Sequence, residues 1–426
     1  MAQGAEEVGE GMKRLALLVG ALLALVAAQS ATSQGKVTLT ILASAGGSGR
    51  TFDAAAKLYA AATGNEVRVV QYPYAEVREK QLLELINNTG NLDLIAVDGQ
   101  IWLGELHRFL EPINITRAEA DAFVPAMLDQ FRFGPQKTLY ALPVRVGGWV
   151  LIYRKDLLDQ IGAKPPRTWE GFLDIAKRLT KDGVYGFAPA FKQGNYLVAQ
   201  WAPFLFSFGG TILNDENTRA AFNTASGRRA TQFMVDLIRK DRVVPPGAAT
   251  YEHADVIAAM QQGLAAMALT YSPYFLDMNN PSRSKVAGKL AVSAFIPADL
   301  STGTRSGKTL LSGWGYGIPK TSKNKDAAMQ FLKFFTSQDT QLKLAVENSN
   351  APTLKGVYTN ATYLKSYPAA AEVAQALRSA EDRPGVAKWT NIEDELSKQL
   401  SAAINGSKTV AQALTDAEAA VNAILR

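Results

Sequence analysis

The chain has 426 residues, of which 47% are hydrophobic and 20% charged, and its 45 Lys and Arg against 39 Asp and Glu give a formal net charge of +6. This composition excludes a disordered, fibrous or disulfide-stapled protein. The absence of cysteine excludes disulfides and thiolate chemistry, and only 2 histidines are present, so we expect neither a metal nor a cofactor. The positive charge is spread along the chain, so we expect no nucleic-acid partner. At about 150 residues per domain, the length predicts two to three domains.

The segment 1–33 is typical of an N-terminal extension followed by a secretory signal peptide. Lys13 and Arg14 precede the apolar run 15–28, and a small polar stretch follows at 29–34. A helix over this run would reach about 21 Å, short of the roughly 30 Å of a bilayer core. Acidic residues lie between Met1 and Met12, so Met12 is favoured over Met1 as the start. We therefore predict cleavage of this segment and a periplasmic or secreted mature protein.

Hydrophobic periodicity predicts alternating strands and helices in the first hundred residues. Apart from Asp93, the segment 92–97 is apolar, which fits a strand buried on both faces. The expected order is a strand at 37–43, a helix at 51–63, a strand at 66–70, a helix at 75–88 and a strand at 92–97. This order predicts a βαβαβ unit with a parallel sheet.

A second α/β unit is predicted further along the chain. Thr168 is a good N-cap for a helix with an inward face that includes Phe172 and Leu179. The other expected elements are strands at 149–153 and 185–189, helices at 196–208 and 226–240, strands at 290–296 and 310–318, a helix at 325–336 and a helical C-terminal region ending in 410–425. The pattern therefore predicts two α/β lobes and a helical tail.

The common catalytic motifs are incomplete in this chain. Ser48 lies in Gly-Gly-Ser-Gly-Arg, where Arg50 replaces the second glycine of a nucleophile elbow. Neither His107 nor His253 has a metal-binding partner at helical spacing, and 315–317 lacks the third glycine of a dinucleotide site. A distant carboxylate pair for glycoside hydrolysis stays open as an alternative.

Aromatic residues stand beside glycine, proline or polar residues at the predicted strand ends and loops. They are Tyr72, Tyr74, Trp102, Trp149, Tyr271, Tyr274, Trp314 and Trp389. Open α/β folds bind their ligands at strand ends. An aromatic face there can stack on the C–H face of a sugar ring while Asp, Asn and Arg side chains bind its hydroxyl groups.

A succession of short segments carries a family resemblance over nearly the whole chain. The segments are 93–98 with 102–104, 139–143, 153–158, 165–169, 263–267, 312–319 and 383–384. In this order and spacing the chain resembles the periplasmic solute-binding proteins of ABC importers, in the carbohydrate group that includes the maltose- and trehalose/maltose-binding proteins.

The resemblance implies an α/β protein with the two-lobe, type II periplasmic-binding-protein fold and a ligand cleft between lobes joined by a crossover hinge. Lobe one would comprise 36–143 and 302–348, and lobe two would comprise 144–301 and 349–426 with the C-terminal helices. The implied function is the substrate-binding component of an ABC importer. The protein would be a monomer, and it would not be an enzyme. It would close on a small sugar or polyol and deliver it to the permease membrane subunits.

The resemblance also implies roles for particular residues. Asp98 would accept a sugar hydroxyl, Trp314 would stack on the ring, Arg383 would reach the cleft from the tail and Tyr274 would be a cleft aromatic residue. The alternatives without a ligand are a helix N-cap for Asp98, packing between lobes for Trp314 and a surface salt bridge for Arg383. Ser272 stands where the trehalose/maltose branch tends to have Trp, which argues against disaccharide specificity.

Arg145 is a departure, because that branch has an acidic residue in the segment 144–149. It could face the cleft and favour an anionic ligand, of a glycerophosphate type for example, or a highly hydroxylated one. Equally, it could pair with a carboxylate across the hinge. Ser48, Tyr72, Gln193 and Asn195 lie in loops near the expected cleft and complete the candidate set. A secreted glycosidase that uses Asp98 with a second carboxylate is the remaining alternative.

Overall fold

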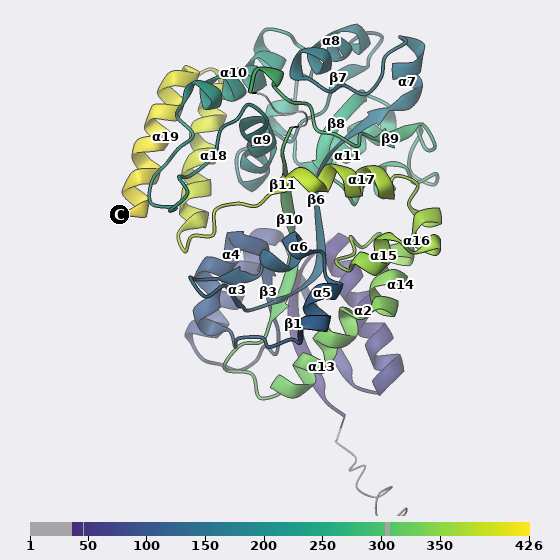
Figure 1. Cartoon of the computed structure of the whole chain (residues 1–426), viewed down its shortest axis with the longest axis vertical. Helices are drawn as coiled ribbons and strands as arrows, with labels where there is room; N and C mark the ends of the chain where they lie inside the picture. The colour runs from purple at the N-terminus through teal and green to yellow at the C-terminus, as the bar shows by residue number, and fades with distance from the viewer. Residues whose placement is uncertain (1–35, 46, 303–306) are drawn as a thin grey trace, which may run out of the picture.

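The computed structural model describes residues 36–45, 47–302 and 307–426. The predicted signal peptide and Gly46 lie outside the described residues. Figure 1 shows two α/β lobes along the long axis of the molecule, with the strands β6 and β10 running from one lobe into the other.

The first lobe begins with the predicted βαβαβ unit. Its elements are β1 (Thr38–Ser44), α2 (Gly47–Thr63), β2 (Glu66–Tyr72), α3 (Tyr74–Ile86) and β3 (Ile95–Asp98). Strand β1 pairs with β2 in parallel from Thr38 to Ser44, and Ile41 forms a parallel bridge to Leu94. The parallel arrangement predicted for this unit is therefore confirmed.

A group of short elements completes the part of the chain before the hinge. It contains α4 (Gly99–Leu106), η1 (His107–Phe109), α5 (Arg117–Ala122), α6 (Pro125–Asp129), β4 (Arg132–Phe133) and β5 (Thr138–Leu139). Trp102 of α4 is only 2% exposed, so it belongs to the core rather than to a ligand surface.

Two long strands form the crossover between the lobes. Strand β6 (Leu142–Arg154) is buried along its whole length. Its first half pairs with β10 (Thr309–Gly317), and its second half pairs with β8 (Ala265–Tyr271) and β9 (Leu290–Val292), all antiparallel. The predicted strand 149–153 was only the second half of this element. The seven-stranded sheet thus passes through both lobes.

Glycine allows β6 and β10 to approach each other closely at this crossover. A Cβ placed on Gly313 would lie 2.4 Å from the carbonyl oxygen of Arg145 and 2.5 Å from the Cα of Val146. Both contacts are with backbone, which cannot move aside without breaking the pairing. The position therefore requires glycine.

The second lobe surrounds the far half of β6. Its elements are α7 (Lys155–Gln160), α8 (Trp169–Leu179), β7 (Tyr185–Phe187), α9 (Asn195–Ser207), α10 (Ala225–Arg239), η2 (Ala248–Thr250), α11 (His253–Gln262), α12 (Tyr274–Met278) and η3 (Leu300–Thr302). The predicted cap is confirmed, because Thr168 Oγ1 accepts from the backbone N–H of Gly171 at 3.0 Å. The pattern missed α11 and β8.

The C-terminal third contains α13 (Lys325–Phe335), α14 (Gln338–Asn348), α15 (Lys355–Tyr358), α16 (Ala361–Ser366), α17 (Ala370–Ala376), η4 (Leu377–Ser379), β11 (Ala380–Glu381), α18 (Trp389–Asn405) and α19 (Val410–Leu425). The inward face predicted for α13 is confirmed, since Phe331 and Phe335 are buried. Helices α18 and α19 lie beside α9 and α10 (Figure 1).

The segment after α14 packs differently from the expected division at residue 348. Leu354 forms a bridge to Phe123, and the Val124 N–H donates to the carbonyl of Thr353 at 2.9 Å. Helices α15 and α16 lie next to α14 (Figure 1). This stretch therefore packs on lobe one and differs from the expected assignment of 349–426 to lobe two.

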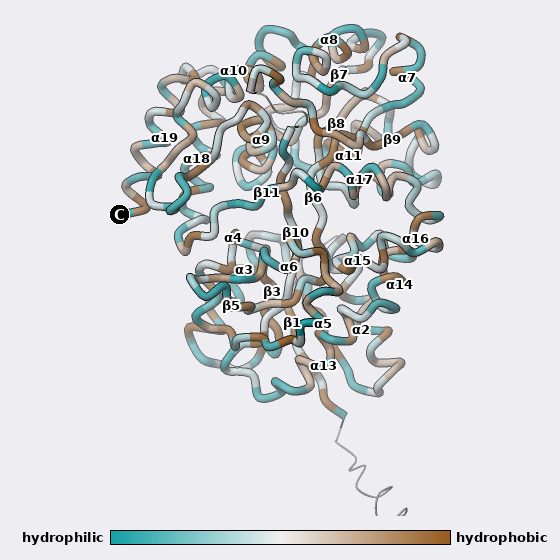
Figure 2. Tube along the Cα trace, in the orientation of Figure 1, coloured by the Kyte–Doolittle hydropathy of each residue, from teal (hydrophilic) through white to brown (hydrophobic). Residues whose placement is uncertain are grey.

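The hydrophobic core follows the strands in both lobes. In Figure 2 the apolar stretches run along β6 and β8, and polar stretches lie on the outer helices. Trp389 is fully buried, so it is a core residue. Within the part of the chain that the structure describes, no helix is long and apolar enough to cross a bilayer.

Candidate ligand site between the lobes

Side chains from both lobes surround a cavity of about 140 Å³. The charged and polar ones are Ser44, Ser48, Asp98, Arg145, Asn195, Ser312 and Arg383. The ring-bearing ones are Tyr74, Trp149, Tyr196, His253, Tyr271, Tyr274 and Trp314. The cavity therefore combines flat rings with charged groups at a junction between two lobes.

The sheet register places three of these residues in one row. Trp314 on β10 is the Cα partner of Asp98 on β3 and also of Arg145 on β6. Directly paired residues of adjacent antiparallel strands point to the same face. Because neighbouring strands lie about 4.8 Å apart, Asp98 and Arg145 begin about 10 Å apart on either side of the Trp314 ring.

Trp314 is held in place by other rings. Its ring centroid lies 5.1 Å from that of Trp102 and 5.9 Å from that of Tyr74, both in edge-to-face contacts. Only 7% of Trp314 is exposed. The ring is thus fixed in orientation while one side of it contributes to the cavity wall.

Asp98 occupies the N-cap position of α4, but its side chain forms no hydrogen bond to the helix backbone. It accepts instead from the Tyr74 hydroxyl at 2.7 Å. Burial raises the pKa of Asp98 to about 6, although Arg383 and the bond from Tyr74 act in the opposite direction. Asp98 is therefore a cavity carboxylate rather than a helix cap.

Arg383 belongs to a buried cluster at one side of the cavity, of which Arg383 and Asn195 line the cavity wall. Its Nε lies 3.4 Å from Glu393 Oε1, and these two side chains are 3% and 6% exposed. Asn195 Nδ2 donates to both carboxylate oxygens of Glu393 at 2.9 Å. Burial raises the pKa of Glu393, and Arg383 and Asn195 lower it. The alternative of a surface salt bridge for Arg383 is wrong, because both side chains of the pair are buried.

Arg145 lies at the other end of the row. Its Nη1 donates to Ser48 Oγ at 3.3 Å, and its guanidinium carbon lies 5.4 Å from the centroid of the Tyr271 ring. Only 6% of the residue is exposed. Among the described residues Arg145 forms no ion pair, unlike Arg154 and Arg383. The alternative of a carboxylate partner across the hinge is therefore wrong for the described chain.

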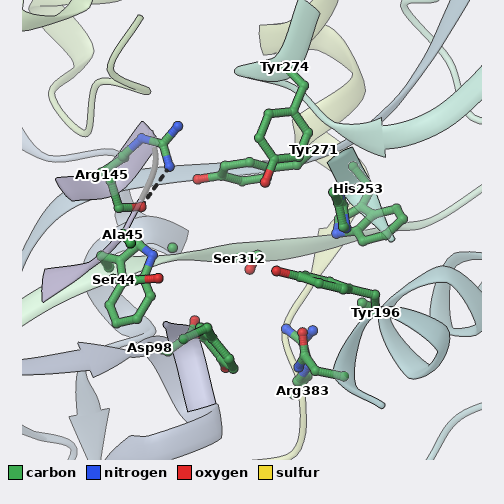
Figure 3. A pocket seen from close by; sticks show the side chains of 17 residues that line it. Ser44, Ala45, Asp98, Arg145, Tyr196, His253, Tyr271, Tyr274, Ser312 and Arg383 are labelled. Atoms are coloured by element: carbon green, nitrogen blue, oxygen red, sulfur yellow. Dashed lines mark hydrogen bonds between the residues drawn. The ribbon is translucent and has the colours of Figure 1, made fainter. Parts of the chain in front are cut away.

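Lobe two supplies a wall of rings centred on His253. Its Nδ1 lies 3.1 Å from Thr270 Oγ1, and its ring centroid lies 4.4 Å from that of Tyr196 and 5.1 Å from that of Tyr274. Burial lowers the pKa of His253 to about 3, so the ring is neutral at physiological pH. In Figure 3 the hydroxyl groups of the labelled tyrosines point into the space between Arg145 and the Asp98 and Arg383 side.

The structure brings most of the candidate residues together. Those that line the cavity are Ser48, Asp98, Arg145, Asn195, Tyr274, Trp314 and Arg383. Tyr72 lies at the end of β2 beside a different cavity, with Lys80 Nζ 4.5 Å from its ring centroid. Gln193 is exposed in the turn before α9. Tyr72 and Gln193 are therefore outside this cavity.

The candidate set omitted several cavity residues, although Tyr74 and Tyr271 are among the aromatic residues noted at the predicted strand ends and loops. Tyr196 follows Asn195 in the first turn of α9, and Tyr271 ends β8. Tyr74 begins α3 directly after Pro73. Tyr74 lines the cavity between the lobes, whereas Tyr72, on the other side of Pro73, does not. Glu393 lies behind the cavity in a helix about 300 residues from Asp98 in sequence, and no motif marks it. In the described residues no cluster of three His, Asp or Glu side chains is placed to hold a metal ion.

Two α/β lobes joined by crossover strands, with a polar and aromatic cavity between them, define a protein of the two-lobe ligand-binding class. The chain belongs to the bacterial extracellular solute-binding protein family, whose sequence pattern matches residues 43–342. It is a solute-binding protein, and the two-lobe periplasmic-binding-protein fold implied by its sequence is confirmed.

Proteins similar to this chain share nearly its full length. A probable ABC transporter-binding protein of Deinococcus radiodurans is 27% identical over 424 residues, covering 96% of this chain and 97% of the relative. A mannitol-binding protein of Pseudomonas aeruginosa is 26% identical over 376 residues, covering 80% and 82%.

Solved structures show the same similarity. The maltose-bound MalE3 of T. maritima has a TM-score of 0.82 and 27% identity, and the match covers 90% of this chain and 99% of that one. A solute-binding protein of Agrobacterium vitis with bound D-mannitol has a TM-score of 0.77 and 25% identity, covering 91% and 97%.

Proposed function

We propose that this protein is the substrate-binding component of an ABC importer and that it captures a small carbohydrate or polyol. The observation that carries the proposal is the row of Asp98, Trp314 and Arg145 facing the tyrosines of lobe two. The ring of Trp314 offers a stacking surface, and the charged residues on either side offer hydrogen bonds to hydroxyl groups. The similar proteins that bind maltose and mannitol support this class of solute.

The size of the cavity favours a solute of no more than one sugar ring. Its volume is about 140 Å³, close to the roughly 150 Å³ of an engineered protein cavity that binds benzene. Three or four hydrogen bonds to charged groups contribute about 1.5–3 kcal/mol each. After the entropic cost of association, this is enough for the approximately −8 kcal/mol of micromolar binding.

The solute can be captured by closure of the two lobes, because each lobe contributes part of the site. Lobe one contributes Asp98 and Trp314, lobe two contributes Tyr196 and Tyr271, and the crossover strands β6 and β10 connect the two. A solute that contacts both sides binds the closed form more tightly than an open form and shifts the population toward closure. The closed form is then the one that the permease membrane subunits would recognise.

This assignment is preferred over glycoside hydrolysis. Glycosidases use two carboxyl groups that flank the scissile bond, whereas Asp98 is the one carboxylate among the described residues that line the cavity. Glu393 faces Arg383 and Asn195 instead. We therefore expect the solute to be released unchanged.

The remaining parts of the proposal concern location and assembly. The segment 1–33 would direct export and be removed, and the mature protein would act as a monomer in the periplasm or outside the cell. N-terminal sequencing of protein recovered from the periplasm would test this, and an intact apolar run 15–28 in that protein would contradict it.

The binding function can be tested with Trp314→Leu. Leucine keeps apolar packing against Trp102 but removes the flat face, so we expect solute affinity to fall about tenfold or more, or about 1.4 kcal/mol. A thermal-shift panel of sugars and polyols identifies the solute, since saturation at 100 times Kd adds about 2.7 kcal/mol of stability. Calorimetry then compares the variant with Phe109→Leu, which lies outside the cavity. Equal affinity of Trp314→Leu and the parent would contradict the stacking role, and conversion of the solute to products would contradict transport.

A further inference from the structure

Arg145 is a buried cation that faces the ligand cavity and has no ion-pair partner among the residues that the structure describes. Its only hydrogen bond among the described side chains is the donation from Nη1 to Ser48 Oγ, and its Nε has no hydrogen-bond partner. A guanidinium has five N–H donors in a planar fork, so most of its capacity is unused. An uncompensated buried charge is costly, and a ligand that supplies the opposite charge removes that cost.

The carboxylates of the site are gathered at the other end. Asp98 and Glu393 both interact electrostatically with Arg383, and Asp382 does so as well. Arg145 is separated from Asp98 by the width of two strand spacings, with Trp314 between them. The cavity is therefore polarised: the carboxylates surround Arg383 at one end, and Arg145 is the positive group at the other end.

A second feature reinforces the positive end. Helix α2 begins at Gly47, has 17 residues and carries no acidic residue in its first turn. The first turn of a helix presents backbone N–H groups without intrahelical partners and a partial positive charge. Ser48 lies in this turn and accepts from Arg145, so its own hydroxyl proton is available to a ligand. Arg145 and the start of α2 thus lie on the same side of the cavity.

We propose that the solute is a sugar acid of single-ring size, an aldonate or a uronate, whose carboxylate binds Arg145 and Ser48 while its hydroxyl groups bind Asp98 and Arg383. This inference rests on the proposed function and narrows its solute class. A carboxylate matches the guanidinium fork in a bidentate manner. Its single negative charge balances Arg145, the one cation without an ion pair among the described residues that line the cavity, whereas a phosphate ester would bring a second negative charge without a partner.

The experiment compares acids with neutral analogues of nearly the same shape. Calorimetry measures the affinity of the purified protein for D-gluconate and D-glucitol, for D-glucuronate and D-glucose, and for D-galacturonate and D-galactose, with D-glucose 6-phosphate as a phosphate probe. We expect at least one acid to bind about tenfold or more tightly than its neutral analogue, as charge-assisted bonds predict.

Two variants assign the preference to Arg145. Arg145→Gln should reduce the acid-to-neutral affinity ratio to about one, because the amide keeps polarity but loses the charge. Arg50→Gln is the matched control, because Arg50 lies two residues from Ser48 in α2 but is exposed, and it should keep the parent ratio. If Arg145→Gln does not fold, Arg145→Lys and the ratio measured on the parent protein decide the question.

The outcomes separate the two proposals. Tighter binding of the neutral analogues, or of D-glucose 6-phosphate, overturns the sugar-acid assignment and leaves carbohydrate binding in place. An acid preference that survives in Arg145→Gln also overturns it. If neither the acids nor the neutral sugars bind, both the assignment and the proposed function are contradicted.

Discussion

Replacing Asp98 with asparagine tests whether the buried charge of Asp98 lowers the free energy of unfolding of the protein without its ligand. The Asp98 carboxylate is buried, with 6% of the residue exposed, and its partner is the Tyr74 hydroxyl at 2.7 Å. Asparagine has nearly the same shape, and its amide oxygen can accept the same hydrogen bond. The substitution therefore removes the charge with little change in packing.

The magnitude follows from the pKa of Asp98. Burial raises it from 3.8 to about 6, so the folded protein binds this proton more tightly than the unfolded chain does. The free energy of unfolding consequently falls as the pH rises from about 4 to about 6, and the full penalty is present above that range. At about 1.36 kcal/mol per pKa unit, the penalty is about 3 kcal/mol. Asp98→Asn should therefore be more stable than the parent by about 2–3 kcal/mol near pH 7.5 and equally stable near pH 4.

Urea unfolding followed by tryptophan fluorescence at several pH values measures this difference. Asp215→Asn is the control, because Asp215 is an exposed loop residue and the substitution removes the same charge. Asp98→Asn should also lose solute affinity by about tenfold or more, since a charged hydrogen bond is lost. A gain in stability that is the same near pH 4 and near pH 7.5, or a loss of stability near pH 7.5, would refute the reasoning.

Two further substitutions test the groups around Asp98. Tyr74→Phe removes the hydrogen bond that lowers the pKa of Asp98, so the pKa of Asp98 should rise above about 6. The pH below which solute affinity declines should then move upward, and titration calorimetry between about pH 5 and pH 8 measures this. An unchanged pH profile would show that Tyr74 does not keep Asp98 ionised. Burial raises the pKa of Glu393 although Arg383 and Asn195 lower it, and Asp98 and Asp382 still face Arg383 when Glu393 is replaced, so Glu393→Gln should not lower the free energy of unfolding near pH 7.5. Urea unfolding compares it with the exposed control Glu216→Gln, and a loss of stability larger than that of the control would show that the charge of Glu393 is needed to hold Arg383.

The local hydrophobic pattern was sufficient to predict many helices and strands, but it did not predict the full length of the crossover strand β6. The alternation of strands and helices predicted β1 to β3 and the inward face of α13, because a strand or helix that covers a core shows its period in the sequence. Strand β6 was predicted only as 149–153, because Pro143 and the glycines at 147 and 148 are residues that usually end a strand. The two glycines lie where β6 changes partners from β10 to β8, and Pro143 lies opposite Gly315, where the pairing with β10 shifts its register.

The sequence also predicted the residues of the candidate site better than their arrangement in space. Asp98, Trp314 and Arg145 were selected through a family resemblance, but their common row depends on the register of β3 and β6 against β10. Tyr72 was selected although Tyr74, beyond the turn at Pro73, lines the cavity. A change of direction at a single turn decides between such neighbours, and neither composition nor periodicity encodes it.

The sequence by itself determined the α/β class, the order of most elements and the succession of segments that marks the family, because these depend on local periodicity and on residues close together in the chain. The tertiary structure alone decided that Arg145 lacks a carboxylate partner among the described residues, and that Glu393 and Asn195 hold Arg383 from behind. These relations join residues up to about 200 positions apart. Their energies depend on burial and distance, and both quantities exist only once the lobes and the C-terminal helices have packed together.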